Sequence, residues 1–391
     1  MSLTQKGIVI KDVKSNKGQI ASNYEKYTKV KPNDIVFNPM DLISGWVDIV
    51  TESGVISPSY SSFRPNENKV NPLFVLYLFQ SLYVNKMLFN FGKGVSTHDG
   101  FGRWTINEDT ILKTNIFLPD KETQNTVVAY LEQKLNKIDT LVEKLQKKID
   151  LLKEQRTSLI NQYVTKGLDP NVEMKTSGIE WIGDIPKHWT ISKFKYVSNL
   201  YSGNSLNEKQ KLEYKSENLE DIPYVSSKDI DLDLHNVAYN NGLRIPKNKN
   251  TFKTAPIGSF LMVIEGGSAG KKIAYLEQEV CFVNKLCAFH STENAKFQYY
   301  FVQSQNYQDK FKSLISGLIG GVSLSNLKNI ELVRPPLQEQ QNIVRVLEEK
   351  TKKIDRLFEI ENRRISLLIE YRRSLVSSAA IGKYKITDDM L

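Results

Sequence analysis

The most regular hydrophobic pattern of the chain lies in two segments that repeat each other. Residues 137–144 read KIDTLVEK, and residues 353–360, which lie 216 positions later, read KIDRLFEI. Apolar side chains around both copies recur at alternating steps of four and three, the a/d spacing of a helix that buries a seam against a partner helix. The first seam contains Leu131, Leu135, Ile138, Val142, Leu145, Ile149 and Leu152. The second contains Leu347, Thr351, Ile354, Phe358, Glu361, Ile365 and Leu368, so a carboxylate interrupts it.

The match extends without a gap over more than forty residues at the constant offset of 216, which indicates an internal duplication. Prolines stand before both segments, where a helix tolerates them, and Gly167 and Gly382 follow them. We predict two helices of about 40–45 residues, roughly 60–65 Å long at about 1.5 Å rise per residue. Two copies in one chain can pair with each other. The alternative is that each helix buries one face on its own domain.

The segments between the helices mix β-prone runs with one helical stretch, at 294–311 in the second domain, and each ends in a last short strand, at 115–118 in the first. The pattern predicts domains over residues 1–118 and 175–334, and helical regions over 119–174 and 335–391. The element order of the two domains is the same when residues 34–38 are aligned with 259–263. The second domain then has some 45 more residues at its start, so we expect the first to be N-terminally incomplete. The expected fold class is α+β with two mixed α/β domains.

Composition adds a partner class and a compartment. Lys and Arg outnumber Asp and Glu by 53 to 44, the net charge is +9, and the sequence pI is near 9.1, which favours a polyanionic partner such as nucleic acid. There is no apolar run of 18 residues and no apolar core of a signal peptide, so we expect no membrane span and a cytoplasmic location. Cys281 and Cys287 lie in a β-prone run and are predicted to be buried thiols. With His290 they do not complete a metal site.

Two loop motifs resemble catalytic signatures and fail on inspection. EGGSAGKK at 265–272 is one residue too short for a phosphate-binding GxxxxGK loop and lacks the following Ser or Thr, so it reads as a Gly-rich hairpin turn. FNPM at 37–40 lacks the second proline and the aromatic residue of the loop that holds a flipped adenine in amino-methyltransferases. Asn38 is therefore predicted to be a turn residue.

Asp120, Glu132 and Lys134 have the spacing of a PD…ExK nuclease, whose acids bind Mg²⁺. The second copy of the repeat argues against this reading, because it keeps Glu348 and Lys350 but has Pro336 in place of Asp120. The sequence therefore predicts no catalytic or metal-binding residues.

Aromatic, basic and small polar residues in the loops of both domains are the remaining candidates for DNA contacts. Arg and Lys can position a protein on phosphates, while Ser, Asn and His can read base edges. The candidates are Lys93, Ser96, His98, Arg103, Trp104, Tyr201, Asn204, Ser226, Ser227, Lys228, Lys271, Lys272, Lys312, Ser323 and Ser325.

Two segments carry a resemblance to a known family. GLDPNVEMKTSGIEWIGDIPKHW, at 167–189, is similar to the central conserved region of the specificity subunits (HsdS) of type I restriction–modification systems. The pattern RPPLQEQQNIV…KKIDRL…RRSLVSSAAIGK resembles their distal conserved region. The resemblance is specific in these helical regions and weak in the two domains between them.

The resemblance implies two target-recognition domains separated by an antiparallel coiled-coil pair of helices with pseudo-twofold symmetry. It implies a non-catalytic subunit that directs two adenine-N6 methyltransferase (modification) subunits to a bipartite target in double-stranded DNA. Restriction subunits are an optional addition. The chain itself would hold no cofactor, since S-adenosylmethionine, ATP and Mg²⁺ would be bound by partner subunits. A self-sufficient nuclease or methyltransferase, or a coiled-coil scaffold without a DNA role, are the alternatives.

Overall fold

The computed structural model describes residues 1–5, 7–11, 23–42, 45–94, 104–113, 115–317, 320–383, 385–387 and 390. The chain forms two compact units, and each unit contains one half of each long helix. Unit 1 comprises Met1–Lys147 and Glu361–Leu391, and unit 2 comprises Lys148–Ile360.

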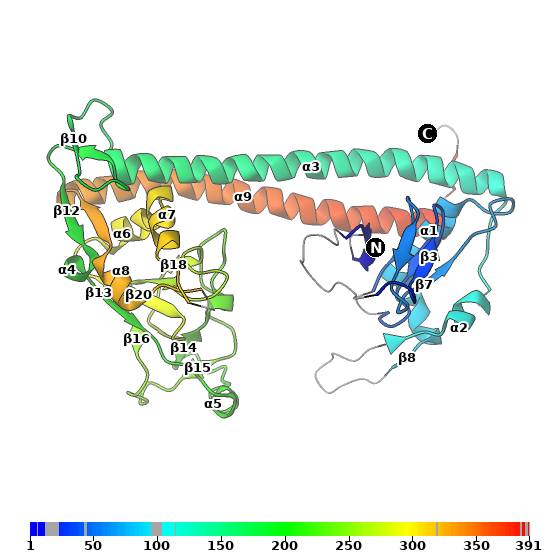
Figure 1. Ribbon diagram of the computed structural model, residues 1–391, viewed down its shortest axis with the longest axis horizontal. Coiled ribbons are helices and arrows are strands. Elements are labelled where there is room, and N and C mark those ends of the chain that lie inside the picture. The colour runs from blue at the N-terminus through cyan, green and yellow to red at the C-terminus, as the bar shows by residue number, and fades with distance from the viewer. Residues whose placement is uncertain are drawn as a thin grey trace. The chain divides into compact units, whose positions relative to one another are not determined.

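The two duplicated segments are long helices, α3 (Lys121–Lys166, 46 residues) and α9 (Leu337–Ala380, 44 residues) (Figure 1). Asp120 begins α3 by accepting a hydrogen bond from the backbone N–H of Thr123 at 2.8 Å, as an N-cap residue does. Gly167 follows α3 and Gly382 follows α9, with φ of 75° and 69°, so both helices end in the left-handed turn that glycine favours. The helix prediction is confirmed.

Unit 1 adds a small antiparallel sheet and one well-buried helix to its helix halves. The sheet has the order β5-β4-β7, and a second ladder pairs β3 with β6. The strands of unit 1 are β1 (Ser2–Thr4), β2 (Gly7–Val9), β3 (Thr28–Val30), β4 (Ile35–Phe37), β5 (Val47–Ile49), β6 (Gly54–Ile56), β7 (Ser61–Phe63), β8 (Lys93–Gly94) and β9 (Trp104–Thr105). Its helices are α1 (Pro72–Val84), the 3-10 helix η1 (Met87–Phe91) and α2 (Glu108–Lys113).

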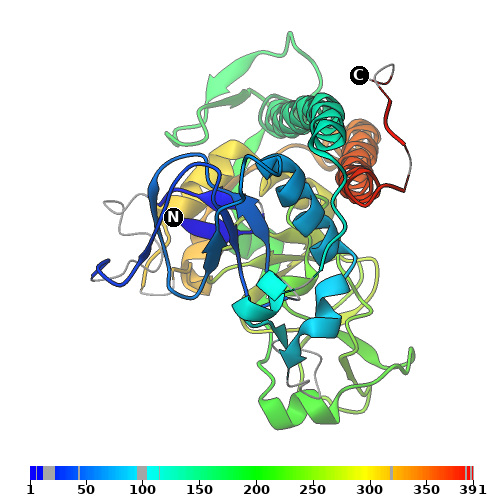
Figure 2. The same ribbon diagram turned by 90° about the vertical axis from the view of Figure 1, so that its right-hand side faces the viewer.

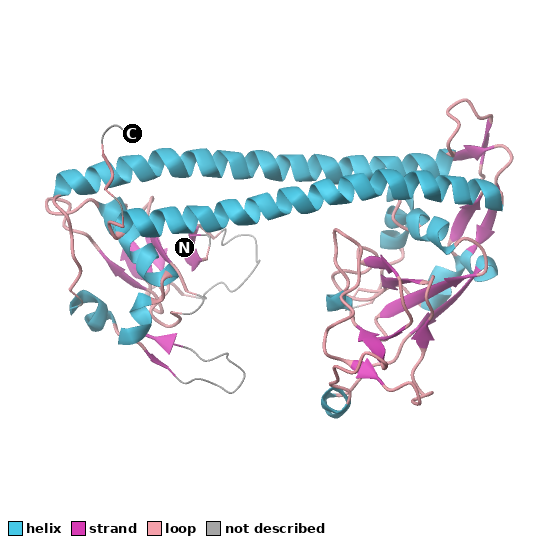
Figure 3. Ribbon diagram, turned by 180° about the vertical axis from the view of Figure 1, so that it is seen from behind, coloured by secondary structure: helices cyan, strands magenta, loops and turns pink. Residues whose placement is uncertain are grey.

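Unit 2 has two four-stranded sheets, in the orders β13-β20-β17-β18 and β15-β14-β19-β16. Its strands are β10 (Met174–Thr176), β11 (Asp184–Pro186), β12 (Thr190–Lys193), β13 (Ser198–Ser202), β14 (Ile222–Val225), β15 (Arg244–Ile245), β16 (Thr254–Ala255), β17 (Phe260–Val263), β18 (Ile273–Tyr275), β19 (Val280–Phe282), β20 (Leu286–Ser291) and β21 (Glu331–Arg334). Its helices are α4 (Phe194–Val197), α5 (Glu208–Glu213), η2 (Ser227–Asp229), α6 (Ala295–Phe301), α7 (Gln305–Ser313) and α8 (Leu324–Asn329). Figure 3 shows that in each unit the main sheets lie to one side of the helix pair, whereas the β10–β11 hairpin of unit 2 lies at its other side.

The two units share one topology, as the alignment of residues 34–38 with 259–263 predicts. The central strand β4 is flanked by β5 and β7, and its counterpart β17 is flanked by β18 and β20, with antiparallel pairing throughout. The ladder of β3 and β6 corresponds to that of β16 and β19. Asn33 and Gly258 precede the central strands with φ of 71° and 84°. Both residue types tolerate this left-handed conformation, so the turn is retained although the sequence has changed.

Each unit has a core that includes its halves of the long helices. In unit 1, residues of α1 such as Phe74 and Leu78 pack with Leu131 and Ile138 of α3 and with Ala379 of α9. In unit 2, the core combines aromatic residues of α6 with Val164 of α3. In each unit the helix halves therefore pack on the domain and also on each other. Both alternatives considered from the sequence, pairing between the helices and burial on their own domain, occur in the structure.

Three details differ from the sequence-based expectations. The helical stretch 294–311 is two helices. The first, α6, ends at Phe301, and Ser304 then caps α7 by accepting a hydrogen bond from Tyr307 N–H. Residues 115–118, expected as a last short strand, are not in a strand in the described structure, although the corresponding residues 331–334 form β21. The two cysteines lie on two strands, β19 and β20, of different sheets.

Candidate functional site: helix pair and recognition loops

The predicted seam is the buried face of both helices. In α3, Leu131, Leu135, Ile138, Leu145, Ile149 and Leu152 are buried, and Val142 is half-buried. In α9, Leu347, Thr351, Ile354 and Glu361 are buried, and Phe358, Ile365 and Leu368 are half-buried. Glu361, only 2% exposed, is paired with Arg364 at 3.1 Å, so the interruption of the second seam is a buried carboxylate with a cationic partner.

The same ion pair joins the two helices once in each unit. In unit 1, Arg372 Nε of α9 lies 3.0 Å from Asp139 Oδ1 of α3. In unit 2, Arg156 Nε of α3 lies 2.9 Å from Asp355 Oδ1 of α9. The two arginines are 216 positions apart in the sequence, and so are the two aspartates. Exchange of the helices in the sequence therefore maps one pair onto the other, as expected where two copies of one helix pair antiparallel.

The aspartates of the ion pairs are the third residue of each repeated KID sequence. Sequence reasoning missed Asp139 and Asp355 as residues that join the helices. The signal was present: in an antiparallel pair, each arginine faces the aspartate of the other copy. In unit 2, Arg156 also donates to Gln303 Oε1 at 2.8 Å, and burial raises the pKa of Asp355 although Arg156 opposes this.

Outside the seam, the helices carry exposed leucines that also repeat. Leu141 and Leu367 are exposed in unit 1, and Leu357 and Leu151 are their counterparts, again exposed, in unit 2. The two units therefore present matching exposed leucines on their halves of the two helices. Figure 2 shows the ribbons of these helices end-on. Single exposed leucines are common on protein surfaces, so it is their repetition at equivalent positions of both helices that makes them candidates for a contact with another chain.

Three loop regions of unit 2 meet on one surface, which we call the recognition-loop surface: residues 226–236, residues 264–272, and residues 314–317 with 320–323. Lys272 Nζ of the second loop donates to Ser227 O of the first at 2.9 Å. Gly266 N of the second donates to Gly320 O of the third at 2.8 Å. Residues 264–272 connect the antiparallel strands β17 and β18, so the reading of EGGSAGKK as a hairpin connection is confirmed.

Seven of the predicted DNA-contact residues are on this surface or beside it. They are Ser226, Ser227, Lys228, Lys271, Lys272, Lys312 and Ser323. Lys228 and Lys271 are exposed, whereas Lys312 is paired with Asp309 at 3.3 Å. Ser226 and Ser323 accept or donate local hydrogen bonds at the start of η2 and α8. Ser325 is exposed on α8.

The other candidates are distributed differently. Tyr201 donates from its hydroxyl to Thr254 O at 2.8 Å, and Asn204 Oδ1 accepts from Lys253 N at 2.9 Å, so both side chains hold strand ends together. Trp104 donates from Nε1 to Phe89 O at 2.9 Å and stacks on the Phe89 ring. Lys93 is exposed on β8. Ser96, His98 and Arg103 lie outside the described residues.

The residues of the nuclease-like spacing have other surroundings. Asp120 is an exposed helix cap, and hydrogen bonds from Thr123 hold the pKa of its carboxyl below its ordinary value. Glu132 is exposed on α3, and the Lys134 ammonium lies 5.3 Å from the centre of the Tyr130 ring. Within the described ranges, no group of three His, Cys, Asp or Glu residues is arranged to hold a metal ion.

The two cysteines are buried thiols, as predicted. Burial raises the pKa of the Cys281 thiol to about 12 and that of Cys287 further, so neither is a thiolate at neutral pH. Asn38 accepts a hydrogen bond from Met40 N at 3.0 Å, which confirms it as a turn residue. As far as the chain is described, none of its helices is long and apolar enough to cross a membrane.

Known proteins with similar sequences share one description. Residues 186–370 match the family model of the type I restriction modification DNA specificity domain. The "Putative type I restriction enzyme MjaX specificity subunit" of Methanocaldococcus jannaschii is 24% identical over 331 residues, covering 83% of this chain and 70% of that protein. The type I restriction enzyme MjaVIII specificity subunit of the same organism is 21% identical over 381 residues, covering 92% and 83%.

A solved structure has the same fold. It comes from work on complex assembly and conformational transition of the type I R-M system, and it superposes with a TM-score of 0.65 at 15% identity. The match covers 93% of this chain and 85% of the other.

Proposed function

We propose, from the premise that this chain is a DNA specificity subunit of a type I restriction–modification system, that each of its two units reads one half of a bipartite duplex target. The observation that carries the proposal is one topology used twice with different loops. The strands around β4 and those around β17 correspond one to one, yet the loop residues that follow them differ in length and chemistry. Two such units suit two different half-sites.

In unit 2, we propose that the recognition-loop surface contacts DNA. Lys228 and Lys271 are exposed there, and no ion pair within the described residues engages either ammonium. Such lysines bind phosphates, and the neighbouring Ser226 and Ser227 are short polar side chains of the kind that reach base edges.

The helix pair would dock two modification subunits. A pseudo-twofold frame offers the same contact surface twice, and two identical partners can then bind it equivalently. The repeated ion pairs and the repeated exposed leucines, Leu141 with Leu367 and Leu151 with Leu357, support this proposal. In such a complex the chain is non-catalytic. S-adenosylmethionine would be bound by the modification subunits, and ATP and Mg²⁺ by restriction subunits where these are present.

A methyl-transfer assay separates this proposal from a self-sufficient enzyme. The purified chain is mixed with duplex DNA and labelled S-adenosylmethionine, with and without a modification subunit from the same system. We expect methylated adenine only in the mixture that contains both proteins. Asp120→Ala should leave this activity unchanged, because Asp120 is an exposed helix cap. Methyl transfer or cleavage by the chain alone, lost in Asp120→Ala, would overturn the proposal.

A further inference from the structure

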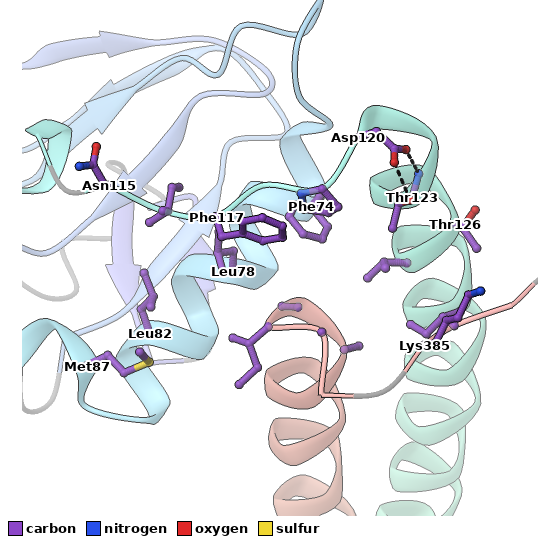
Figure 4. Close-up of a pocket in the computed structure, with 18 of the residues that line it drawn as sticks. Phe74, Leu78, Leu82, Met87, Asn115, Phe117, Asp120, Thr123, Thr126 and Lys385 are labelled. Carbon is purple, nitrogen blue, oxygen red and sulfur yellow. Dashed lines mark hydrogen bonds between the residues drawn. The ribbon is translucent and has the colours of Figure 1, made fainter.

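Unit 1 contains an open apolar cavity of about 1030 Å³ at the start of α3 and the end of α9 (Figure 4). It is lined by Phe74 and Leu78 of α1, by Val127 of α3, by Ala380 of α9, and by Phe117 in the segment that leads into α3. Phe117 is 90% exposed. None of the described residues shields the Phe117 side chain from water. Phe117 and the cavity therefore form one exposed apolar surface.

The internal repeat identifies the same place in unit 2. The offset of 216 relates Phe117 to Val333, Val127 to Ile343, and Ala380 to Val164. Helices α1 and α6 both follow an asparagine N-cap, Asn71 and Asn294. Phe74 and Phe297 therefore correspond, as do Leu78 and Phe301.

In unit 2 this place is filled. The segment 178–194, which reads GIEWIGDIPKHWTISKF, inserts Ile182, Ile185, Trp189 and Phe194 into one core with Phe297, Phe301, Val164, Ile343 and Val333. Trp181 and Phe194 contact the Phe301 ring, with centroids 6.3 Å and 6.4 Å away. Strand β12 of the segment also pairs antiparallel with β21, and Ile191 lies opposite Val333. Val333 is consequently fully buried, whereas its counterpart Phe117 is exposed.

We propose that the cavity of unit 1 binds an extended segment of a separate polypeptide with the chemistry of residues 178–194. The segment would insert Ile, Trp and Phe side chains between α1 and the two helix ends. It would also add a strand beside residues 115–118, with its residue equivalent to Ile191 opposite Phe117. Backbone pairing of this kind supplies affinity, and the apolar pocket supplies specificity.

Other occupants suit the cavity less well. A second copy of this chain holds its own Trp189 and Phe194 fully buried, so donating them would expose that apolar surface to water. Residues 12–22 of the same chain read DVKSNKGQIAS and contain no aromatic side chain. A separate polypeptide incurs neither cost, and the proposal depends on neither DNA nor modification subunits.

The test adds a synthetic, fluorescently labelled peptide of residues 178–194 to the full chain. We expect saturable binding by fluorescence anisotropy, with slower hydrogen exchange in residues 115–127 and 379–387. Phe117→Asp in the protein should weaken binding at least about tenfold, because it places a carboxylate opposite the apolar strand. The matched control is Leu212→Asp, at a leucine of α5 in unit 2 that is 77% exposed, and it should bind the peptide normally.

A second test changes the peptide instead of the protein, so that the substitutions cannot unfold the protein. A peptide with Ile185→Asp and Trp189→Ala should not compete with the labelled one. The proposal is overturned if the peptide does not bind, or if neither Phe117→Asp in the protein nor the double substitution in the peptide weakens binding. It is also overturned if the protection from hydrogen exchange is confined to unit 2. It is also overturned if the chain alone forms a dimer that Phe117→Asp dissociates, because the occupant would then be a second copy.

Discussion

Asp139 and Asp355 occupy the same position of the two repeats but differ in their exposure to water. The Arg156 and Asp355 side chains are 12% and 30% exposed, whereas those of Arg372 and Asp139 are 37% and 51% exposed. Removing one partner of an ion pair that is largely shielded from water is strongly destabilising, because the other charge remains in a poorly solvated site. An exposed pair contributes little, since water and salt already screen it.

We therefore expect Asp355→Ala to lower the free energy of unfolding by about 2–4 kcal/mol and Asp139→Ala by about 0–1 kcal/mol. Urea unfolding of the two variants measures this difference, and each serves as the control for the other because the repeat places them equivalently. Equal losses would show that the two copies of the ion pair have the same solvent environment in solution.

Lys228 and Lys271 are the residues whose charge matters most to the proposed recognition-loop surface. Reversing both to Glu should weaken DNA binding by the assembled complex at least about tenfold and reduce the slope of log affinity against log salt by about 2, as two phosphate contacts are lost. Lys209→Glu, at an exposed lysine of α5 outside the three loop regions, is the control. Fluorescence anisotropy at several salt concentrations gives both quantities. An unchanged slope would place the DNA elsewhere on unit 2.

At the scale of elements, the two faces of the helix pair should respond differently to a carboxylate. Ile138→Asp in unit 1 and Ile354→Asp in unit 2 bury a charge in an apolar seam, and each should cost several kcal/mol of stability. Leu367→Glu and Leu151→Glu change exposed positions of the same helices and should leave thermal unfolding nearly unchanged, while preventing co-purification of a modification subunit. If the exposed variants still assembled normally, the docking surface would lie on another face.

The sequence predicted the long helices well because their pattern is local and repeated. A seam at steps of four and three, a proline before the helix and a glycine after it are each readable from neighbouring residues, and the second copy repeats the first. The shared order of strands was also predictable, since β-prone runs and their turns follow one another in the same sequence in both units.

What the sequence did not predict depends on contacts between distant residues. The ion pairs of Asp139 and Asp355 require the antiparallel alignment of two helices more than two hundred residues apart. Residues 115–118 were expected as a strand, yet a strand needs a neighbouring ladder, and β12 supplies one only to their counterpart β21. The candidate loop residues Tyr201, Asn204 and Trp104 have side chains engaged with the backbone, which composition alone cannot show.

At the scale of the whole molecule, the chain is two versions of one unit, each with a sheet region and two antiparallel helix halves. Duplication keeps the helix pair similar, since both copies make the same ion pair and present the same exposed leucines. The sheets and loops have diverged, as two units that read different half-sites would. The central claim is therefore that a non-catalytic subunit determines the two-part DNA target of its partner enzymes.

Long-read mapping of N6-methyladenine in cells that express this chain with a modification subunit of the same system tests that claim most directly. We predict methylation at a single motif made of two short specified parts and an unspecified spacer of constant length. Lys228→Glu with Lys271→Glu should reduce methylation or relax one part of the motif, while the other part stays the same. If the complex assembles and the methylated adenines share no two-part motif, or if the motif is the same without this chain, the account is contradicted.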